Sequence, residues 1–108
     1  MSLKYVVAIT RPDVLAALEA QLANLHVRGI TVTKVKGFGE YIDFLSKNHL
    51  TEHIKIEIFV DESMADAVIN AILDAAHSDV PGAGIVAVLP VEKFFHIRTR
   101  SEVLPDQT

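Results

Sequence analysis

The clearest pattern along the chain lies over Ile54–Val60, where every second residue from Ile54 is aliphatic. Successive side chains of a strand point to opposite faces, so this alternation predicts a strand with one buried face. Two β-branched runs, Tyr5–Ile9 and Ile30–Val35, predict two further strands. A fourth run, Ile85–Val91, is nearly all apolar, which is typical of a strand covered on both faces. We expect Phe94–Arg98 to form a short last strand.

Two helices are expected between these strands. The first begins near Pro12 and Asp13, which suit a first helical turn, and the second begins after Asp61, which suits an N-cap. The apolar positions that recur at helical spacing predict the inner faces of the two helices. In the first helix they are Leu15, Leu18, Leu22 and Leu25, and in the second Ala65, Val68, Ile69, Ile72 and Ala76.

The order strand, helix, strand, strand, helix, strand predicts one α+β domain over residues 1–108. Such an order gives a ferredoxin-like β-α-β-β-α-β sandwich, with an antiparallel sheet and both helices on one of its faces. The opposite sheet face then needs cover, and the apolar run Ile85–Val91 favours oligomerisation as its source. Residues 104–108 are expected to be a frayed tail.

Residues 40–52 show no sustained period and are expected to form a long flexible loop. Long loops in small domains usually carry function, so we expect this one to have a functional role.

Composition narrows the functional classes. The chain has 108 residues, of which 50% are hydrophobic and 22% charged, with a formal net charge of -4 and no cysteine. The acidic balance, without a local basic patch, argues against nucleic acid as a partner. The missing cysteines exclude disulfides and thiolate metal sites. No secretory signal or long apolar span is evident, so we expect a cytoplasmic protein that is not inserted in a membrane.

Three segments resemble the PII signal-transduction family. The first is Ile30–Gly39 (ITVTKVKGFG), the second is Ile54–Ile58 (IKIEI), and the third joins Gly82–Gly84 to PVE at 90–92 and IRT at 97–99. With Arg11-Pro12 after the first strand, the likeness covers nearly the whole chain except residues 40–52. The resemblance implies a homotrimeric regulator, not an enzyme, which binds adenine nucleotides in clefts between subunits. It also implies a mobile loop that contacts a protein partner, often a membrane transporter. The candidate contact residues in this loop are Glu40, Tyr41, Asp43 and Phe44.

The two glycine turns are candidate anion-binding elements, because residues without side chains let backbone N–H groups approach a ligand. Arg98 could add a bidentate contact to a phosphate group. The plainer interpretation is that these glycines only turn the chain and that Arg98 only pairs with a surface acid. The resemblance favours the effector site, whose candidate residues are Thr31, Gly37, Phe38, Gly39, Gly82, Ala83, Gly84, His96 and Arg98.

The chain departs from the family pattern where cations would meet a triphosphate. Glu40 and His96 stand where the family has arginines, His53 and Ile85 where it has lysines, and Ala83 where it has an aspartate. Each charge-assisted hydrogen bond contributes roughly 1.5–3 kcal/mol, so these losses argue against tight ATP binding of the usual kind. AMP, ADP or a cyclic nucleotide, with fewer phosphates than ATP, fits better. The glutamine that follows the family's arginine is absent here, and the loop is several residues shorter than the family's. Both departures argue against 2-oxoglutarate sensing.

His49 and His53 offer a different interpretation. Residues 49–53 read H-L-T-E-H, which matches the H-x-x-E-H pattern of a class of zinc peptidases. Such a peptidase needs both histidines on a helix and a third ligand from a distant segment, and we expect neither here. The open alternatives are a solvated loop with surface histidines, or a divalent-metal module of the CutA type that uses His49 and His53. His26 and His77 lie near expected helix ends and are interpreted as structural.

Overall fold

The computed structural model describes residues 2–37, 51–79 and 82–102. Along the chain, the elements are β1 (Leu3–Thr10), the 3-10 turn η1 (Pro12–Val14), α1 (Leu15–Asn24), β2 (Thr31–Gly37), β3 (Thr51–Asp61), α2 (Glu62–Ala76), β4 (Gly84–Pro90), β5 (Phe95–His96) and β6 (Ser101–Glu102). The predicted order of four strands and two helices is confirmed.

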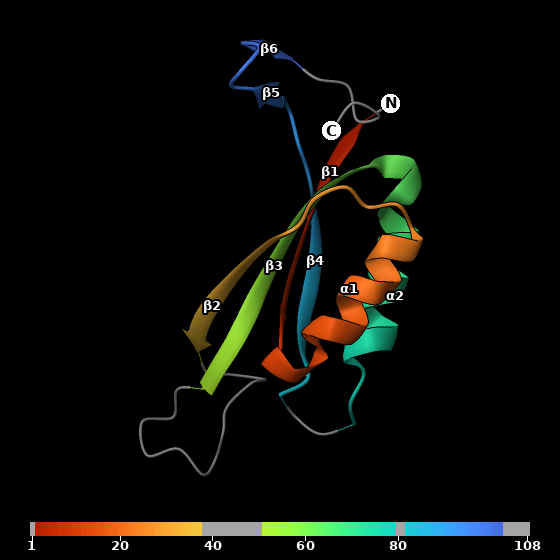
Figure 1. Ribbon diagram of the computed structural model, residues 1–108, viewed down its shortest axis with the longest axis vertical. Coiled ribbons are helices and arrows are strands. Elements are labelled where there is room, and N and C mark those ends of the chain that lie inside the picture. The colour runs from red at the N-terminus through yellow and green to blue at the C-terminus, as the bar shows by residue number, and fades with distance from the viewer. Residues whose placement is uncertain (1, 38–50, 80–81, 103–108) are drawn as a thin grey trace.

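The four long strands form one antiparallel sheet in the order β2-β3-β1-β4. Both helices cover the same face of this sheet (Figure 1). This arrangement is the ferredoxin-like α+β fold that the sequence predicts. In the sheet, β1 lies between β3 and β4, with Thr10 opposite Ile54 on one side and opposite Gly84 on the other.

The core lies between the sheet and the helices, and it follows the two periodicities seen in the sequence. From β3, Ile54, Ile56 and Ile58 are at most 4% exposed. From α1, Leu18 and Leu22 are buried, while the other two predicted leucines are partly buried against the same cluster. In α2 the predicted face is buried except that Ala71 replaces the partly exposed Ile69.

The end of α1 is closed by a Schellman motif, in which the residue after the C-cap adopts a left-handed conformation. That residue is His26, whose φ is 60°. Its N–H donates to the carbonyl of Ala23 over 3.0 Å, and the N–H of Val27 donates to that of Leu22 over 3.2 Å. Glycine is the usual residue at this position, so the histidine is an unfavourable choice for the backbone.

Asp61 caps α2 as predicted. Its Oδ2 accepts a hydrogen bond from the N–H of Ser63 over 3.0 Å and a second one from the Ser63 hydroxyl. These two bonds favour the ionised carboxylate, so they lower the pKa of Asp61 below its ordinary value.

Replacing Asp61 with alanine is therefore expected to destabilise the fold at neutral pH and to have less effect in acid. A group with a lowered folded pKa contributes stability above its unfolded pKa, near 4, and the contribution disappears as the pH falls through the folded value. Urea unfolding between about pH 6 and about pH 3 measures this. The Asp61→Asn variant keeps an acceptor without titrating, so its advantage over alanine should not change with pH. A constant difference between wild type and alanine would contradict this account of the cap.

Two segments differ from the expected pattern. The loop expected at 40–52 ends earlier, because Thr51 and Glu52 already pair with Gly37 and Lys36 of β2. The last strand expected at Phe94–Arg98 is shorter, because residues 97–100 turn the chain back and pair β5 with β6. Residues 40–50 and 104–108, where a flexible loop and a frayed tail are expected, lie outside the described residues.

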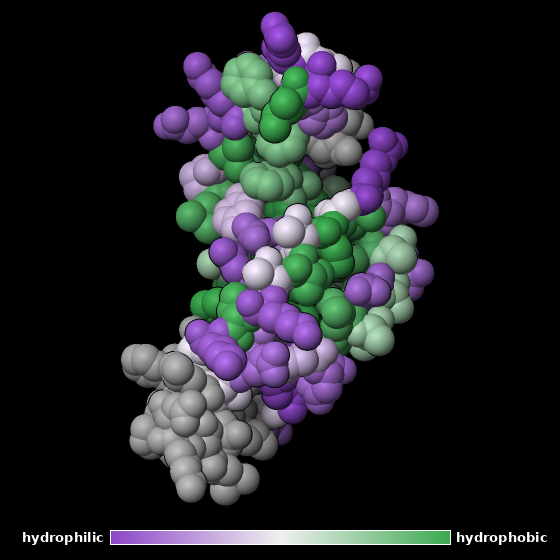
Figure 2. Space-filling model, turned by 60° about the vertical axis from the view of Figure 1, so that its left-hand side comes forward, coloured by the Kyte–Doolittle hydropathy of each residue, from purple (hydrophilic) through white to green (hydrophobic). Residues whose placement is uncertain are grey.

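β4 is an edge strand, and in the single chain it is not covered on both faces as its composition suggested. Ile85 is 49% exposed, Val88 38% and Leu89 45%. The strand is apolar enough to be buried, yet the chain's own elements leave it largely open. Figure 2, which brings the left-hand side of Figure 1 forward, shows apolar side chains over the middle of the molecule, between more polar ends. Within the described residues, no helix is long and apolar enough to cross a membrane.

Candidate functional site

A hollow of about 660 Å³ lies where the α1–β2 connection, the end of β3 and the start of α2 meet the segment before β5. We call it the aromatic cavity, because Phe59 and Phe94 form part of its lining. Gly29 also lines it, and a Cβ built on this glycine would meet no atom within 4 Å. The space beside Gly29 is therefore open, and the cavity is wide enough for a small molecule.

The aromatic wall of the cavity continues a row of rings across the sheet. The ring centroids of Phe59 and Phe94 are 5.1 Å apart, as are those of Tyr5 and Phe59. His96 follows with its centroid 5.9 Å from that of Phe94. Phe59 is 40% exposed, so a flat ligand could stack on this wall.

The two acids that line the cavity already have partners. Glu57 accepts a hydrogen bond from the Tyr5 hydroxyl over 2.6 Å and lies 4.0 Å from the Lys55 ammonium. The bond to Glu57 raises the pKa of Tyr5, because the phenol donates to a carboxylate and loses that bond when it ionises. The other acid is Asp61, which caps α2 through Ser63. Both carboxylates thus accept hydrogen bonds within the protein, although one oxygen of Asp61 is buried without a partner among the described residues.

The second glycine turn lies at the other end of the sheet. Gly82 and Gly84 have φ angles of 104° and 114°, a backbone conformation that residues with side chains rarely adopt. A Cβ on Gly84 would lie 1.9 Å from the carbonyl oxygen of Ile9. Gly84 is therefore required for the close pairing of β4 with β1, whatever else this turn does.

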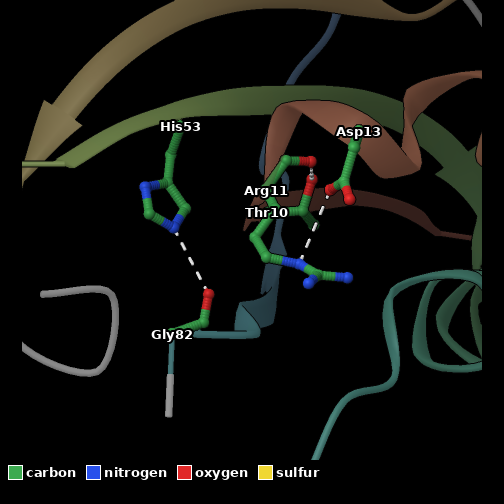
Figure 3. Close-up of polar contacts among 5 residues, drawn as sticks. All are labelled: Thr10, Arg11, Asp13, His53 and Gly82. Atoms are coloured by element: carbon green, nitrogen blue, oxygen red, sulfur yellow. Dashed lines mark hydrogen bonds and ion pairs between the residues drawn. The ribbon is translucent and has the colours of Figure 1, made fainter. Parts of the chain in front are cut away.

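His53 is a buried strand residue, not a histidine of an exposed loop. It is 2% exposed in β3, and its Nε2 lies 3.3 Å from the carbonyl oxygen of Gly82 (Figure 3). Its Nδ1 lies 3.4 Å from the carbonyl oxygen of Thr51. Because neutral imidazole carries one N–H, it donates to one of these oxygens at a time. The ring thereby links the start of β3 to the glycine turn.

This position of His53 also changes the interpretation of residues 49–53. Glu52 and His53 are consecutive residues of β3, so their side chains point to opposite faces of the strand rather than along one face of a helix. The metallopeptidase geometry is therefore excluded. Among the described residues, no three His, Cys, Asp or Glu side chains are grouped to hold a metal ion. His49, the other candidate ligand, lies outside the described residues.

Arg11, which contributes to the family resemblance, follows β1 beside the same turn. Its Nε lies 3.6 Å from Oδ1 of Asp13, close enough for an ion pair (Figure 3). The Thr10 hydroxyl donates to the Arg11 carbonyl over 3.2 Å. Both contacts lie between β1 and η1, next to Gly84, the partner of Thr10 in the sheet.

Within one chain, the structure places the candidate effector residues in two groups at opposite ends of the sheet (Figure 1). Thr31 and His96 line the aromatic cavity, and Arg98 lies in the turn between β5 and β6. The seven residues of β4, roughly 20 Å of strand, separate this end from the other. The other end contains Gly37, Gly82, Ala83 and Gly84, whereas Phe38, Gly39, Glu40, Tyr41, Asp43 and Phe44 lie outside the described residues.

Several residues that line the cavity were not predicted from the sequence. Phe59 could have been found, because it is an aromatic residue on the face of β3 that carries the charged residues Lys55 and Glu57. His26 was interpreted only as a helix end, and it does end α1, but it lines the cavity too. Arg28 also lines the cavity, and nothing in its local pattern marked it.

These features define the class of protein: a small ferredoxin-like α+β domain with a ligand-sized cavity beside its sheet and a glycine turn at the far end. Comparison with known proteins identifies the family. The family described as "Nitrogen regulatory protein P-II" matches residues 3–101. The chain therefore belongs to the nitrogen regulatory protein P-II family, whose members are signalling proteins and not enzymes.

The sequences of individual relatives align with nearly the whole chain. The nitrogen regulatory protein P-II of Azospirillum brasilense is 36% identical over 110 residues, which cover 90% of this chain and 93% of the relative. The protein of the same name from Nostoc punctiforme gives the same figures. Nitrogen regulatory protein GlnK1 of Methanosarcina mazei is 33% identical over 108 residues and 92% of both chains.

Proposed function

We propose that this protein is a homotrimeric regulator that binds a small anionic effector in clefts between its subunits and thereby controls a partner protein. The observation that supports a cleft between subunits is the separation of the two groups of candidate residues. Within one chain, the glycine turns are separated from Thr31, His96 and Arg98 by about the length of β4. A neighbouring subunit could bring its glycine turns to the aromatic cavity, so that both groups contact one ligand.

The exposed apolar surface supports the same assembly. Ile97 is 94% exposed at the turn between β5 and β6, and Phe95 is 53% exposed beside it. Together with the open edge strand β4, these side chains leave apolar surface that a single chain does not cover. A closed trimer would bury such surface at each of its equivalent contacts.

We propose an adenine nucleotide with few phosphates as the effector. The family binds ATP, ADP and 2-oxoglutarate in general. In this chain, the loss of cations at the positions where the family meets the triphosphate favours AMP, ADP or a cyclic nucleotide. A base could stack on Phe59 and Phe94, while the backbone of the opposing glycine turns receives the phosphate. ATP would find fewer charged partners for its terminal phosphates.

Regulation would then work through the loop at 40–50. That segment follows Gly37 of β2 and leads into Thr51 of β3, so it joins strands that end beside the glycine turns. Effector binding at the cleft would favour one loop conformation, and that conformation would determine the fit to a partner. A membrane transporter, or a component of nitrogen or carbon metabolism, is the proposed partner, with Glu40, Tyr41, Asp43 and Phe44 as contacts.

Mixed trimers test whether the cleft lies between subunits. Ile85→Glu places a negative charge beside the glycine turn on a half-exposed side chain, and Arg98→Ala removes the cation at the other end. Each variant alone is expected to lose AMP binding. Refolding the two variants together should restore part of it, because some clefts then combine the intact end of one chain with the intact end of the other.

The control refolds each variant with itself, and gel filtration checks that all samples have the mass of a trimer. Recovery of binding only in the mixture supports the cleft between subunits. If the mixture binds no better than either variant alone, the ligand site is contained in one chain and the proposal is wrong.

A further inference from the structure

His26 occupies a backbone position that is better suited to glycine. Its φ of 60° closes α1, and left-handed conformations at helix ends are usually adopted by glycine because a Cβ is disfavoured there. Non-glycine residues held in this region gather at ligand-binding sites, where the cost in stability is retained for function. The structure is consistent with such a role, because His26 lines the aromatic cavity.

Arg28 lies two residues further along and lines the same cavity. Both side chains are exposed, and within the described part of the chain neither has a hydrogen-bond or ion-pair partner. By contrast, the two acids of the cavity are bound to Tyr5 and Ser63. The cavity thus contains two nitrogen-donor side chains that no protein group among the described residues occupies, while its two carboxylates accept hydrogen bonds from other residues. His26 and Arg28 therefore remain available to donate to an anion.

We propose that His26 and Arg28 form an anion-binding pair at the aromatic cavity and hold a phosphate group of the effector. This inference rests on the proposed function and adds a specific contact to it. A ligand whose base stacks on Phe59 would lie in the cavity that His26 and Arg28 line, so an imidazole and a guanidinium can donate to the phosphate that the opposing glycine turns also contact. Such a contact would replace part of the charge missing at the glycine turns.

The test compares AMP with adenosine, which has the same base and sugar but no phosphate. In calorimetric titrations of the full chain, His26→Gly and Arg28→Gln are each expected to weaken AMP binding about tenfold and to leave adenosine binding unchanged. His26→Gly should also raise Tm by several degrees, since glycine relieves the left-handed strain. A more stable protein that binds AMP less well is the result that a merely structural histidine would not give.

Arg100 provides a matched control. It is the other non-glycine residue with a positive φ, 57°, among the described residues, and it is exposed but does not line the cavity. Arg100→Gly should raise Tm as His26→Gly does, with no change in AMP affinity. An equal loss of AMP and adenosine binding in the His26 and Arg28 variants, or no loss at all, would overturn the anion-binding pair.

Wild-type protein that binds neither AMP nor adenosine would contradict the nucleotide form of the proposed function. In that case, a titration with inorganic phosphate tests the anion-binding pair independently of nucleotide binding. The NMR signals of the His26 ring and the Arg28 side chain are monitored during the titration. Shifts of both signals that saturate with phosphate would support it. Unchanged signals would overturn it.

Discussion

Replacing Gly84 with alanine is expected to destabilise the protein by roughly 3 kcal/mol or more, which is among the largest effects of a single methyl group. The new Cβ would lie 1.9 Å from the carbonyl oxygen of Ile9, and the φ of 114° is unfavourable for alanine. The backbone must therefore move away from β1 at the point where Thr10 pairs with Gly84. Urea unfolding of the purified variant measures the loss.

Gly29→Ala is the matched control. Its φ is not in the positive region, and a Cβ there meets nothing within 4 Å, so the free energy of unfolding should change by no more than about 0.5 kcal/mol. If both variants have the same stability, the close approach of β4 to β1 at Gly84 does not constrain the fold. In that case, the glycine turn would need another explanation.

Replacing Arg98 with alanine is expected to weaken effector binding by more than tenfold and to leave the mass of the assembly in solution unchanged. Arg98 is exposed in the turn between β5 and β6, and it has no hydrogen-bond or ion-pair partner among the described residues. Its removal should therefore cost the fold little, and the loss of a charge-assisted bond to phosphate should account for the change in affinity. Calorimetry with AMP and light scattering measure the two properties.

Lys93→Ala serves as the control for Arg98, because it removes an exposed cation from the segment just before β5. Affinity should not change in this variant. An Arg98 variant that binds as tightly as wild type would show that the turn between β5 and β6 takes no part in the cleft.

The sequence predicts the fold well where one periodicity is unambiguous. Alternation in β3 and leucine spacing in α1 each determine a buried face, and the cap at Asp61 marks the start of α2. The last strand was predicted less well, because Phe95–Arg98 alternates apolar and polar residues as a strand does, yet the chain turns back after His96. Whether an apolar strand such as β4 is covered depends on its neighbours in space, and a local sequence pattern does not reveal them.

The candidate site was only partly predictable. The glycine turns and Arg98 could be named from motifs, but their separation along the sheet is a property of the topology. The position of His53 could not be predicted either, because it depends on strand pairing. Its neighbours along the chain suggest an exposed loop, whereas pairing of Thr51 and Glu52 with β2 extends the strand and buries the imidazole against Gly82. Arg28 lines the cavity because of where the α1–β2 connection passes, and no short motif marks that position.

The most direct test of the central claim is a calorimetric titration of metal-free protein with AMP, ADP, ATP and cyclic AMP, repeated with zinc alone. The account predicts micromolar binding of at least one adenine nucleotide with few phosphates, at about one molecule per subunit, and weaker binding of ATP. Heat from zinc together with no heat from any nucleotide would contradict it, because the fold would then serve a sensing chemistry other than the one proposed for these clefts.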